Sequence, residues 1–194
     1  MSTFNLANVT PQRVAYMFPH AAGERIRKHL PNVLQALDAA GLGDRDMVIM
    51  ALATIAAETA GFEPISEFKS RFNTAPGGEP FALYDNRRSL GNTAPGDGAR
   101  FKGRGFVQLT GRDNYRRIGQ KIGVDLVSDP ERANEPKTAA KILAAFLASR
   151  ETKIRAALKK GDLAAARKLV NGGSHGLDRF QQAFKTGANM LPAA

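Results

Sequence analysis

The sequence predicts a predominantly α-helical protein with one globular domain, and three observations support this fold class. Residues 47–61, MVIMALATIAAETAG, are apolar on nearly every side, as in a helix buried at the centre of a domain. Residues 61–98 contain recurring Gly, Pro and Asn and keep no helical period. From residue 113 onward, apolar side chains return at helical spacing. We therefore expect helices around a buried central helix, with a small irregular or β-containing lobe at about residues 61–105.

The segments before and within this lobe carry local signals. A Thr-Pro pair marks the start of a short helix at residues 10–18. Residues 22–40 have helical spacing but contain Pro31, which predicts either one kinked helix or two short ones. Asp44 is placed to cap the central helix. In the lobe, residues 80–92 fit a short amphipathic helix or an irregular flap, and the pattern does not decide between them.

The segments after the lobe are expected to be helical. Residues 113–122 are predicted to form the first part of a helix. Residues 137–150 have a broad apolar stripe, which also predicts a helix. Residues 152–170 contain two basic helices separated around Gly161, and residues 177–190 form the last helix.

Length and composition limit the possible classes of protein. A chain of 194 residues is long enough for one catalytic domain, and we expect a single domain over residues 1–194 with no separate module. It has no cysteine and three scattered histidines, so we expect neither disulfides nor a metal site, and no cofactor. The N-terminus lacks the pattern of a signal peptide, and no apolar run reaches the length of roughly 18 residues that a membrane span needs. We expect synthesis in the cytoplasm without a signal peptide.

The net charge of +10 is concentrated in two stretches. Residues 100–121 hold seven basic residues and one acidic residue, and residues 150–185 hold nine basic and three acidic residues. Such a surface favours a polyanion such as nucleic acid, anionic lipid or an acidic wall polymer, unless it is only a solvated face. Few aromatic residues accompany the first stretch and no nucleic-acid-binding motif is present, so nucleic acid is not expected as a partner. The surface charges counted here include Lys159, Lys160, Arg167 and Lys168.

Glu58 is the one carboxylate at the end of the apolar stretch. An isolated buried carboxylate is costly, so it stays neutral or finds a partner, and a neutral carboxyl group can act as a general acid. The alternative is a glutamate that reaches solvent at the end of the helix and has no catalytic role.

A second group of polar residues follows three glycines at positions 103, 105 and 111. The glycines do not match a dinucleotide-binding fingerprint, because Gln108 occupies the third glycine position. Gln108, Thr110, Asn114 and Tyr115 supply neutral hydrogen-bonding groups suited to sugar hydroxyls and amides. The alternative is a flexible loop that joins two packed helices.

Three runs of this sequence resemble the signatures of glycoside hydrolase family 19. They are AETAGF at residues 57–62, GDGARFKGRGFVQLTGRDNY at residues 96–115 and VNGGSHG at residues 170–176. The resemblance spans about residues 45–180, in the same order. The family comprises chitinases and the lysozyme-like endolysins of bacteriophages, so the resemblance implies a fold of the lysozyme superfamily.

The resemblance also implies roles for individual residues. Glu58 matches the general acid, Glu67 the second carboxylate of the compact members, and Thr110 a hydroxyl that helps to hold the attacking water. Two departures from the plant members are Ala57, where they have histidine, and a shorter loop to the second carboxylate, so Glu63 competes with Glu67. The positions that match substrate contacts are Arg104, Gln108, Asn114, Tyr115 and Asn171, with Arg179 as a counterpart of an arginine that follows the third signature.

The function that the resemblance implies is hydrolysis of β-1,4 glycosidic bonds with inversion, which places the two carboxylates roughly 6.5–9.5 Å apart. We expect a monomeric phage endolysin that acts on peptidoglycan, at the wall or in the periplasm after release. A weak contact of the basic C-terminal helices with the anionic outer membrane is a further expectation. The alternatives are a chitinase acting on chitin oligosaccharides, a lytic transglycosylase, and a non-enzymatic wall-binding or nucleic-acid-binding protein.

Overall fold

The computed structural model describes residues 4–171 and 176–191, and it divides into two compact units. We call residues 1–63 and 143–194 the terminal unit, and residues 64–142 the middle unit. The lobe expected at residues 61–105 lies largely within the middle unit, which continues to Ile142.

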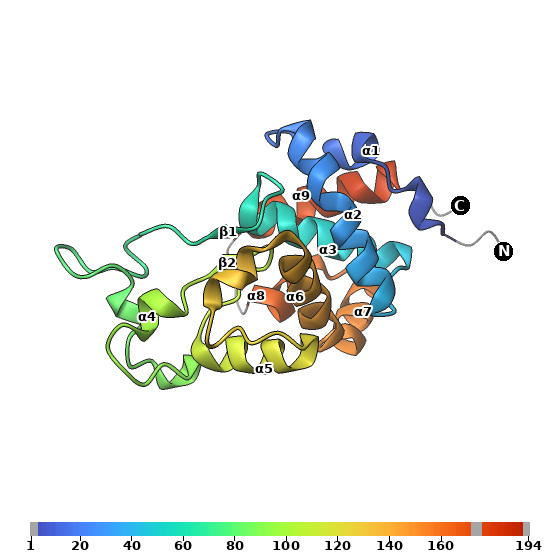
Figure 1. The fold of residues 1–194 in the computed structure, drawn as a ribbon. Helices are drawn as coiled ribbons and strands as arrows, with labels where there is room; N and C mark the ends of the chain where they lie inside the picture. Colours follow the sequence, from blue (N-terminus) through green and yellow to red (C-terminus); the bar gives the residue numbers. More distant parts are fainter. Residues whose placement is uncertain (1–3, 172–175, 192–194) are drawn as a thin grey trace. The chain divides into compact units, whose positions relative to one another are not determined.

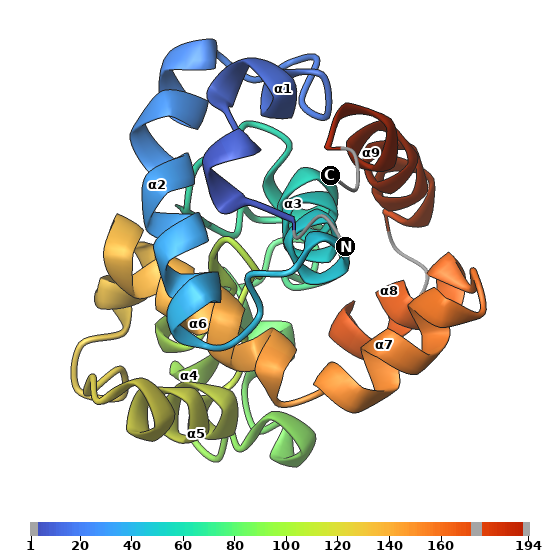
Figure 2. The same cartoon turned by 90° about the vertical axis from the view of Figure 1, so that its right-hand side faces the viewer.

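The terminal unit is helical and is built around α3 (Arg45–Thr59), which contacts α7 and α9 (Figure 2). Every residue of α3 from Met47 to Ala57 is buried, which confirms the prediction of a central apolar helix. The other helices of this unit are α1 (Pro11–Ala15), α2 (Gly23–Ala39), α7 (Glu151–Lys159), α8 (Leu163–Asn171) and α9 (Leu177–Met190).

The expected helix starts are present in this unit. The Thr10 hydroxyl accepts a hydrogen bond from the Arg13 N–H at 3.4 Å. The Asp44 carboxylate accepts from the Met47 N–H at 3.3 Å and is itself paired with Arg155 at 2.6 Å. Burial acts to raise the pKa of Asp44, but the hydrogen bonds from Arg155 and Met47 together lower it.

One continuous helix, α2, crosses Pro31, so the alternative of two short helices is wrong. The proline lies on the exposed side of the helix. Arg27, whose carbonyl loses its intrahelical donor, is exposed as well. Water can satisfy that carbonyl, and the buried apolar face continues past the proline through Val33 and Leu37.

The middle unit contains a small antiparallel sheet and short helices (Figure 1). Strand β1 (Ile65–Ser66) pairs with β2 (Arg104–Gly105) in the register Ile65 to Gly105 and Ser66 to Arg104. Helix α6 (Pro136–Ala148) begins in this unit and continues into the terminal unit. The other elements are α4 (Asp97–Arg100), α5 (Arg112–Ile122) and 3₁₀ helices at Ala82–Tyr84, Arg88–Leu90 and Pro130–Asn134.

Residues 80–92 form two of these 3₁₀ helices, which resolves the choice that the sequence left open in favour of an irregular segment. The segment is held by Asn92, which is fully buried. Its amide donates to the Tyr84 carbonyl at 2.9 Å and accepts from the Arg112 N–H at 3.0 Å. Side-chain hydrogen bonds thus add to the short-range backbone bonds of the two 3₁₀ helices.

None of the described helices is long and apolar enough to cross a membrane.

Candidate active-site residues

Glu58 lies in the last turn of α3, with a side chain that is 13% exposed. Its Oε1 atom is 2.8 Å from Nη2 of Arg167, so this carboxylate has an oppositely charged partner. The sequence predicted that a buried glutamate would stay neutral or find a partner, and the structure shows a partner. The alternative of a glutamate turned out to solvent does not fit this degree of burial.

The chain reverses direction directly after Glu58. Ala60 and Phe62 have φ angles of 47° and 54°, which side chains other than glycine rarely adopt. The Phe62 ring is fully buried and packs edge-on against Phe18, with ring centroids 4.7 Å apart. Burial of this ring fixes the turn and so fixes the end of the helix that carries Glu58.

Arg167, on α8, pairs with the predicted acid Glu58, so its expected place among the surface charges is wrong. It was counted as a surface charge, but its side chain is fully buried. Its guanidinium also lies 6.0 Å from the centre of the Phe180 ring. The signal was in its spacing, because Arg167 shares one face of α8 with the buried residues Ala166 and Val170.

The competing residues of the terminal unit occupy other positions. Glu63 is paired with Arg25 at 3.1 Å, and both side chains are at least one-third exposed. Arg179 is exposed on α9 and lines a small cavity of about 160 Å³, whereas the arginine paired with Glu58 is Arg167. Asn171 is the last residue of α8, and the rest of its motif, residues 172–175, lies outside the described residues.

Glu67 belongs to the middle unit and directly follows β1. Its Oε1 accepts from the Asn73 amide at 2.9 Å and from the Tyr84 hydroxyl at 2.8 Å. Its Oε2 accepts from the Gly103 N–H at 3.1 Å. Burial and the hydrogen bond to Glu67 raise the pKa of Tyr84 to about 12. These three hydrogen-bond donors to Glu67 are all uncharged.

Asn73 organises the turn that follows Glu67. It is fully buried, and its amide nitrogen donates both to Glu67 and to the Phe68 carbonyl, each at 2.9 Å. Its amide oxygen accepts from the Ser70 N–H at 2.8 Å. Glu67 and the turn over residues 68–73 are therefore one hydrogen-bonded unit.

Gly103 approaches Glu67 from β2's side of the sheet. A Cβ atom at this position would lie 2.9 Å from Oε1 of Gln108 and 3.2 Å from Oε2 of Glu67. The Glu67 N–H also donates to the Gly103 carbonyl at 2.8 Å. Only glycine leaves room for this close approach of the backbone.

Two predicted substrate contacts, Gln108 and Asn114, and the predicted water-holding residue Thr110 are partly exposed and joined by hydrogen bonds. The Gln108 amide donates to the Ile65 carbonyl at 2.9 Å, with the Gln108 backbone at φ 50°. The Thr110 hydroxyl donates to the Gln108 carbonyl at 2.9 Å, and the Asn114 amide donates to the Thr110 carbonyl at 2.8 Å. The Asn114 amide oxygen accepts from Arg117 at 2.9 Å, whereas the Thr110 hydroxyl can still accept a hydrogen bond from a polar ligand.

Two other predicted contacts, Arg104 and Tyr115, are buried. Arg104 donates to the Tyr115 hydroxyl at 3.0 Å and through Nε to Glu131 at 3.0 Å. Burial raises the pKa of Tyr115 to about 12, although the charge of Arg104 acts in the opposite direction. In this structure both side chains form hydrogen bonds inside the protein. A direct contact of either residue with substrate stays a prediction.

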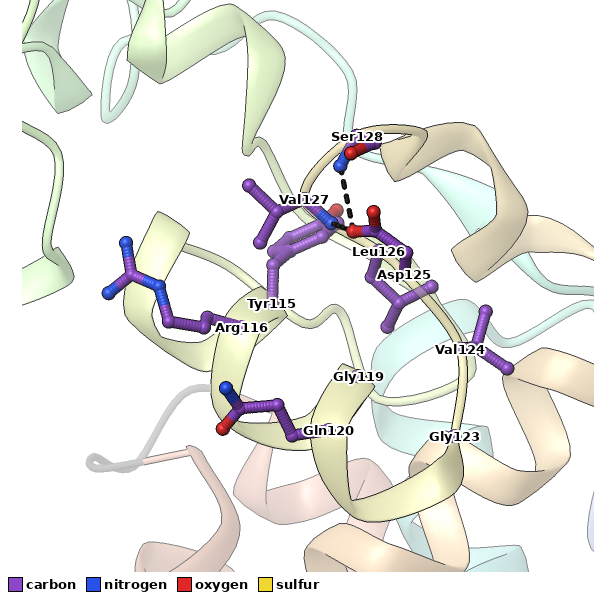
Figure 3. Close-up of a pocket in the computed structure, with 10 residues that line it drawn as sticks. All are labelled: Tyr115, Arg116, Gly119, Gln120, Gly123, Val124, Asp125, Leu126, Val127 and Ser128. Atoms are coloured by element: carbon purple, nitrogen blue, oxygen red, sulfur yellow. Dashed lines mark hydrogen bonds between the residues drawn. The ribbon is translucent and has the colours of Figure 1, made fainter.

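A cavity of about 530 Å³ opens beside α5 in the middle unit (Figure 3). It is lined by Tyr115, Arg116, Gln120 and the loop of residues 123–128. The Asp125 carboxylate in this loop caps the Val127 and Ser128 N–H groups, and the bonds from Ser128 lower its pKa. The cavity thus lacks the paired carboxyl chemistry of the predicted site. Among the described residues, no three His, Asp or Glu side chains are grouped to hold a metal ion.

Comparison with known proteins supports the resemblance. No protein-family model matches the chain. Over 49 residues it is 41% identical to a glycosyl hydrolase family 19 domain-containing protein of Haemophilus influenzae. That match covers 25% of this chain and 24% of the relative, so the chain spans about a quarter of the length of the curated relative it matches.

Two solved structures share the fold over nearly the whole chain. Chitinase C from Streptomyces griseus has a TM-score of 0.66 at 21% identity, over 95% of this chain and 76% of that one. A bacterial family 19 chitinase has a TM-score of 0.67 at 17% identity, over 96% of this chain and 97% of that one. The predicted fold class is therefore confirmed. The chain has the mainly helical fold of these two chitinases and resembles glycoside hydrolase family 19 in sequence.

Proposed function

We propose that the protein is a glycosidase that hydrolyses β-1,4 bonds of bacterial peptidoglycan, as a phage or prophage endolysin that lyses the cell. The observation that carries this proposal is the contrast between two carboxyl groups. Glu58 is largely buried, with 13% of its side chain exposed, and is held by one cation, whereas Glu67 is held by uncharged donors. Hydrolysis of a glycosidic bond needs one carboxyl group as acid and one as base, and different surroundings allow this division.

In the proposed mechanism Glu58 is the general acid. Its Oε1 is bonded to Arg167, so Oε2 is the oxygen left to carry a proton and deliver it to the leaving glycosidic oxygen. Arg167 then stabilises the carboxylate that forms. The ion pair also fixes the direction of the carboxyl group, which a long flexible side chain would otherwise lose.

Glu67 is the proposed general base. A carboxylate offers about four lone-pair positions, and Asn73, Tyr84 and Gly103 occupy three of them. The remaining position, on Oε2, accepts the proton of the attacking water. The resemblance assigns Thr110 to the same water. Direct attack by water predicts inversion at the anomeric carbon, which proton NMR of the first products tests.

Peptidoglycan is proposed over chitin because of charge. The chain carries +10, and peptidoglycan bears peptide carboxylates whereas chitin is neutral. A chitinase is the second candidate, because the solved structures that share this fold are chitinases by name. We further propose that the protein acts as a monomer, reaching the wall from the cytoplasm after release.

The deciding experiment is digestion of purified peptidoglycan and, in parallel, of chitin, with mass spectrometry of the products. The proposal expects hydrated reducing ends from peptidoglycan at a rate well above that on chitin. Faster release of oligosaccharides from chitin would assign the chitinase function. Anhydro-sugar ends would instead assign a lytic transglycosylase.

A further inference from the structure

The middle unit exposes a cluster of large apolar side chains next to Glu67. After β1 the chain runs out as a long loop before it returns to α4 (Figure 1). We call residues 67–88 the arm. Phe68 is 76% exposed, Phe72 is 68% exposed and Leu83 is 44% exposed. Among the described residues one other large apolar side chain, Tyr16 of the terminal unit, is comparably exposed. An exposed apolar cluster of this kind usually marks a contact surface.

The exposure is imposed by an ordered backbone. Asn73 is fully buried and bonds to the Phe68 carbonyl and the Ser70 N–H, so it closes the turn that carries both phenylalanines. The Leu83 N–H donates to the Asn73 carbonyl at 3.2 Å, which brings Leu83 to the same turn. The three apolar side chains are therefore presented by one hydrogen-bonded structure.

Four cations lie close to these apolar residues in the sequence of the arm. Lys69, Arg71, Arg87 and Arg88 are all exposed, and none forms an ion pair among the described residues. The Arg71 guanidinium lies 4.9 Å from the centre of the Phe72 ring. Of the three carboxylates in the arm, Glu67 and Asp85 are occupied by hydrogen-bond donors. The charges that face solvent are thus mainly positive.

We propose that the arm binds the surface of an anionic phospholipid bilayer, which goes beyond the proposed glycosidase function. Phe68, Phe72 and Leu83 would enter the boundary between headgroups and acyl chains, and the cations would lie on the lipid phosphates. A bilayer fits this surface better than a sugar chain does. An aliphatic residue and four cations suit apolar chains under anionic headgroups, whereas a neutral sugar face needs neither.

The absence of tryptophan from the sequence makes a direct test available. In a Glu58→Gln background, so that hydrolysis has no part, Phe72→Trp gives a single fluorescent reporter in the arm. Vesicles of phosphatidylethanolamine with phosphatidylglycerol should shift its emission to the blue, and vesicles of phosphatidylcholine should not. Tyr16→Trp in the same background is the matched control at an exposed site of the terminal unit and should show no shift.

Cosedimentation with the same anionic vesicles measures binding without the reporter. Phe68→Ser with Phe72→Ser should weaken binding by about tenfold or more, because apolar contact with the acyl chains is lost. Lys69→Gln with Arg71→Gln should weaken it by about fivefold or more at low salt. Tyr16→Ser and the pair Lys159→Gln with Lys160→Gln remove the same groups elsewhere and should have little effect. The Phe68 carbonyl that binds Asn73 is kept in every arm variant, and circular dichroism checks the fold.

Three results would overturn the inference. They are an unshifted Phe72→Trp emission, an equal shift at Tyr16→Trp, and a shift produced by chitin or peptidoglycan fragments but not by vesicles. The last would make the arm a sugar-binding platform. None of these results bears on hydrolysis, which is measured separately with the unmodified chain on purified substrates.

Discussion

Arg167 reaches from α8 to Glu58 at the end of α3 and lies 2.8 Å from its carboxylate, with the arginine side chain wholly buried. A buried charge without its partner is costly, so the stability of each residue depends on the other. The same contact brings a helix from the C-terminal part of the chain to the proposed acid.

Replacing Arg167 by methionine should destabilise the fold strongly. The change leaves Glu58 poorly solvated and without its cation, and losses of this kind are about 3–5 kcal/mol. Urea unfolding measures the effect. Lys168→Met, at the exposed neighbouring position, is the control and should change the free energy of unfolding by less than about 0.5 kcal/mol. A loss below about 1 kcal/mol for the Arg167 variant would show that the ion pair contributes little.

Replacing Glu58 by glutamine should leave a folded protein that has lost most activity. The amide keeps the size of the side chain but cannot protonate the leaving oxygen, and general acid assistance contributes about 10²–10⁴-fold. Initial rates on purified peptidoglycan give the result. A folded variant that retains more than about a tenth of the wild-type rate would remove Glu58 from this role.

Most of the terminal unit was predictable because its signals are local. The apolar run of α3, the caps at Thr10 and Asp44, and the break around Gly161 all follow from neighbouring residues. Arg167 was not predicted correctly, because its partner lies more than a hundred residues away. A basic residue in a basic helix looks like a surface charge until its face is compared with the apolar stripe.

Glu67→Gln should reduce activity far more than Glu63→Gln. Glu67, the proposed general base, accepts hydrogen bonds from uncharged donors, whereas Glu63 forms a partly exposed ion pair with Arg25. Rates for both variants on the same peptidoglycan preparation decide the order. A larger loss for Glu63→Gln would move the second carboxylate to that position, and equally mild effects would indicate a mechanism that needs only Glu58.

The surroundings of Glu67 are what the sequence did not reveal. The loop of residues 61–98 has no period from which side-chain directions follow, and Asn73, Tyr84 and Gly103 reach Glu67 through turns and a strand pairing. The family resemblance identified Glu67 as the second carboxylate. It did not identify the residues that donate hydrogen bonds to Glu67.

Stability should fall at alkaline pH because of two tyrosines. The pKa values of Tyr84 and Tyr115 are about 12 in the folded protein, above the ordinary value of about 10. The neutral phenols are therefore favoured by folding, so their contribution is complete below about pH 10 and is lost as the pH rises through about 12. Tyr84→Phe should flatten the decline in unfolding free energy over this interval. An identical decline in Tyr84→Phe would contradict the assignment.

The exposed lysines of the C-terminal helices should gather anionic substrate. Replacing Lys153, Lys159, Lys160 and Lys168 by glutamine should lower activity on whole walls at low salt, with little change on a short neutral oligosaccharide. At 0.1 M ionic strength screening shortens the attraction to about 10 Å, so high salt should produce the same effect in the unmodified protein. Full activity of the fourfold variant on walls at low salt would show that these charges are an ordinary solvated surface. Arg167 is left out of this set because it is buried.

The buried amide of Asn73 has a consequence for redesign. The Asn73 side chain donates hydrogen bonds both to Glu67, the proposed base, and to the turn that carries Phe68 and Phe72. The arm therefore cannot be replaced as a whole without affecting Glu67. Residues 68–72 can be exchanged to redirect what the protein adheres to, provided that position 73 keeps an asparagine. Replacing the whole loop, Asn73 included, would instead remove a hydrogen-bond donor from Glu67. If Glu67 is the base, such a variant would bind a new surface but hydrolyse its substrate more slowly.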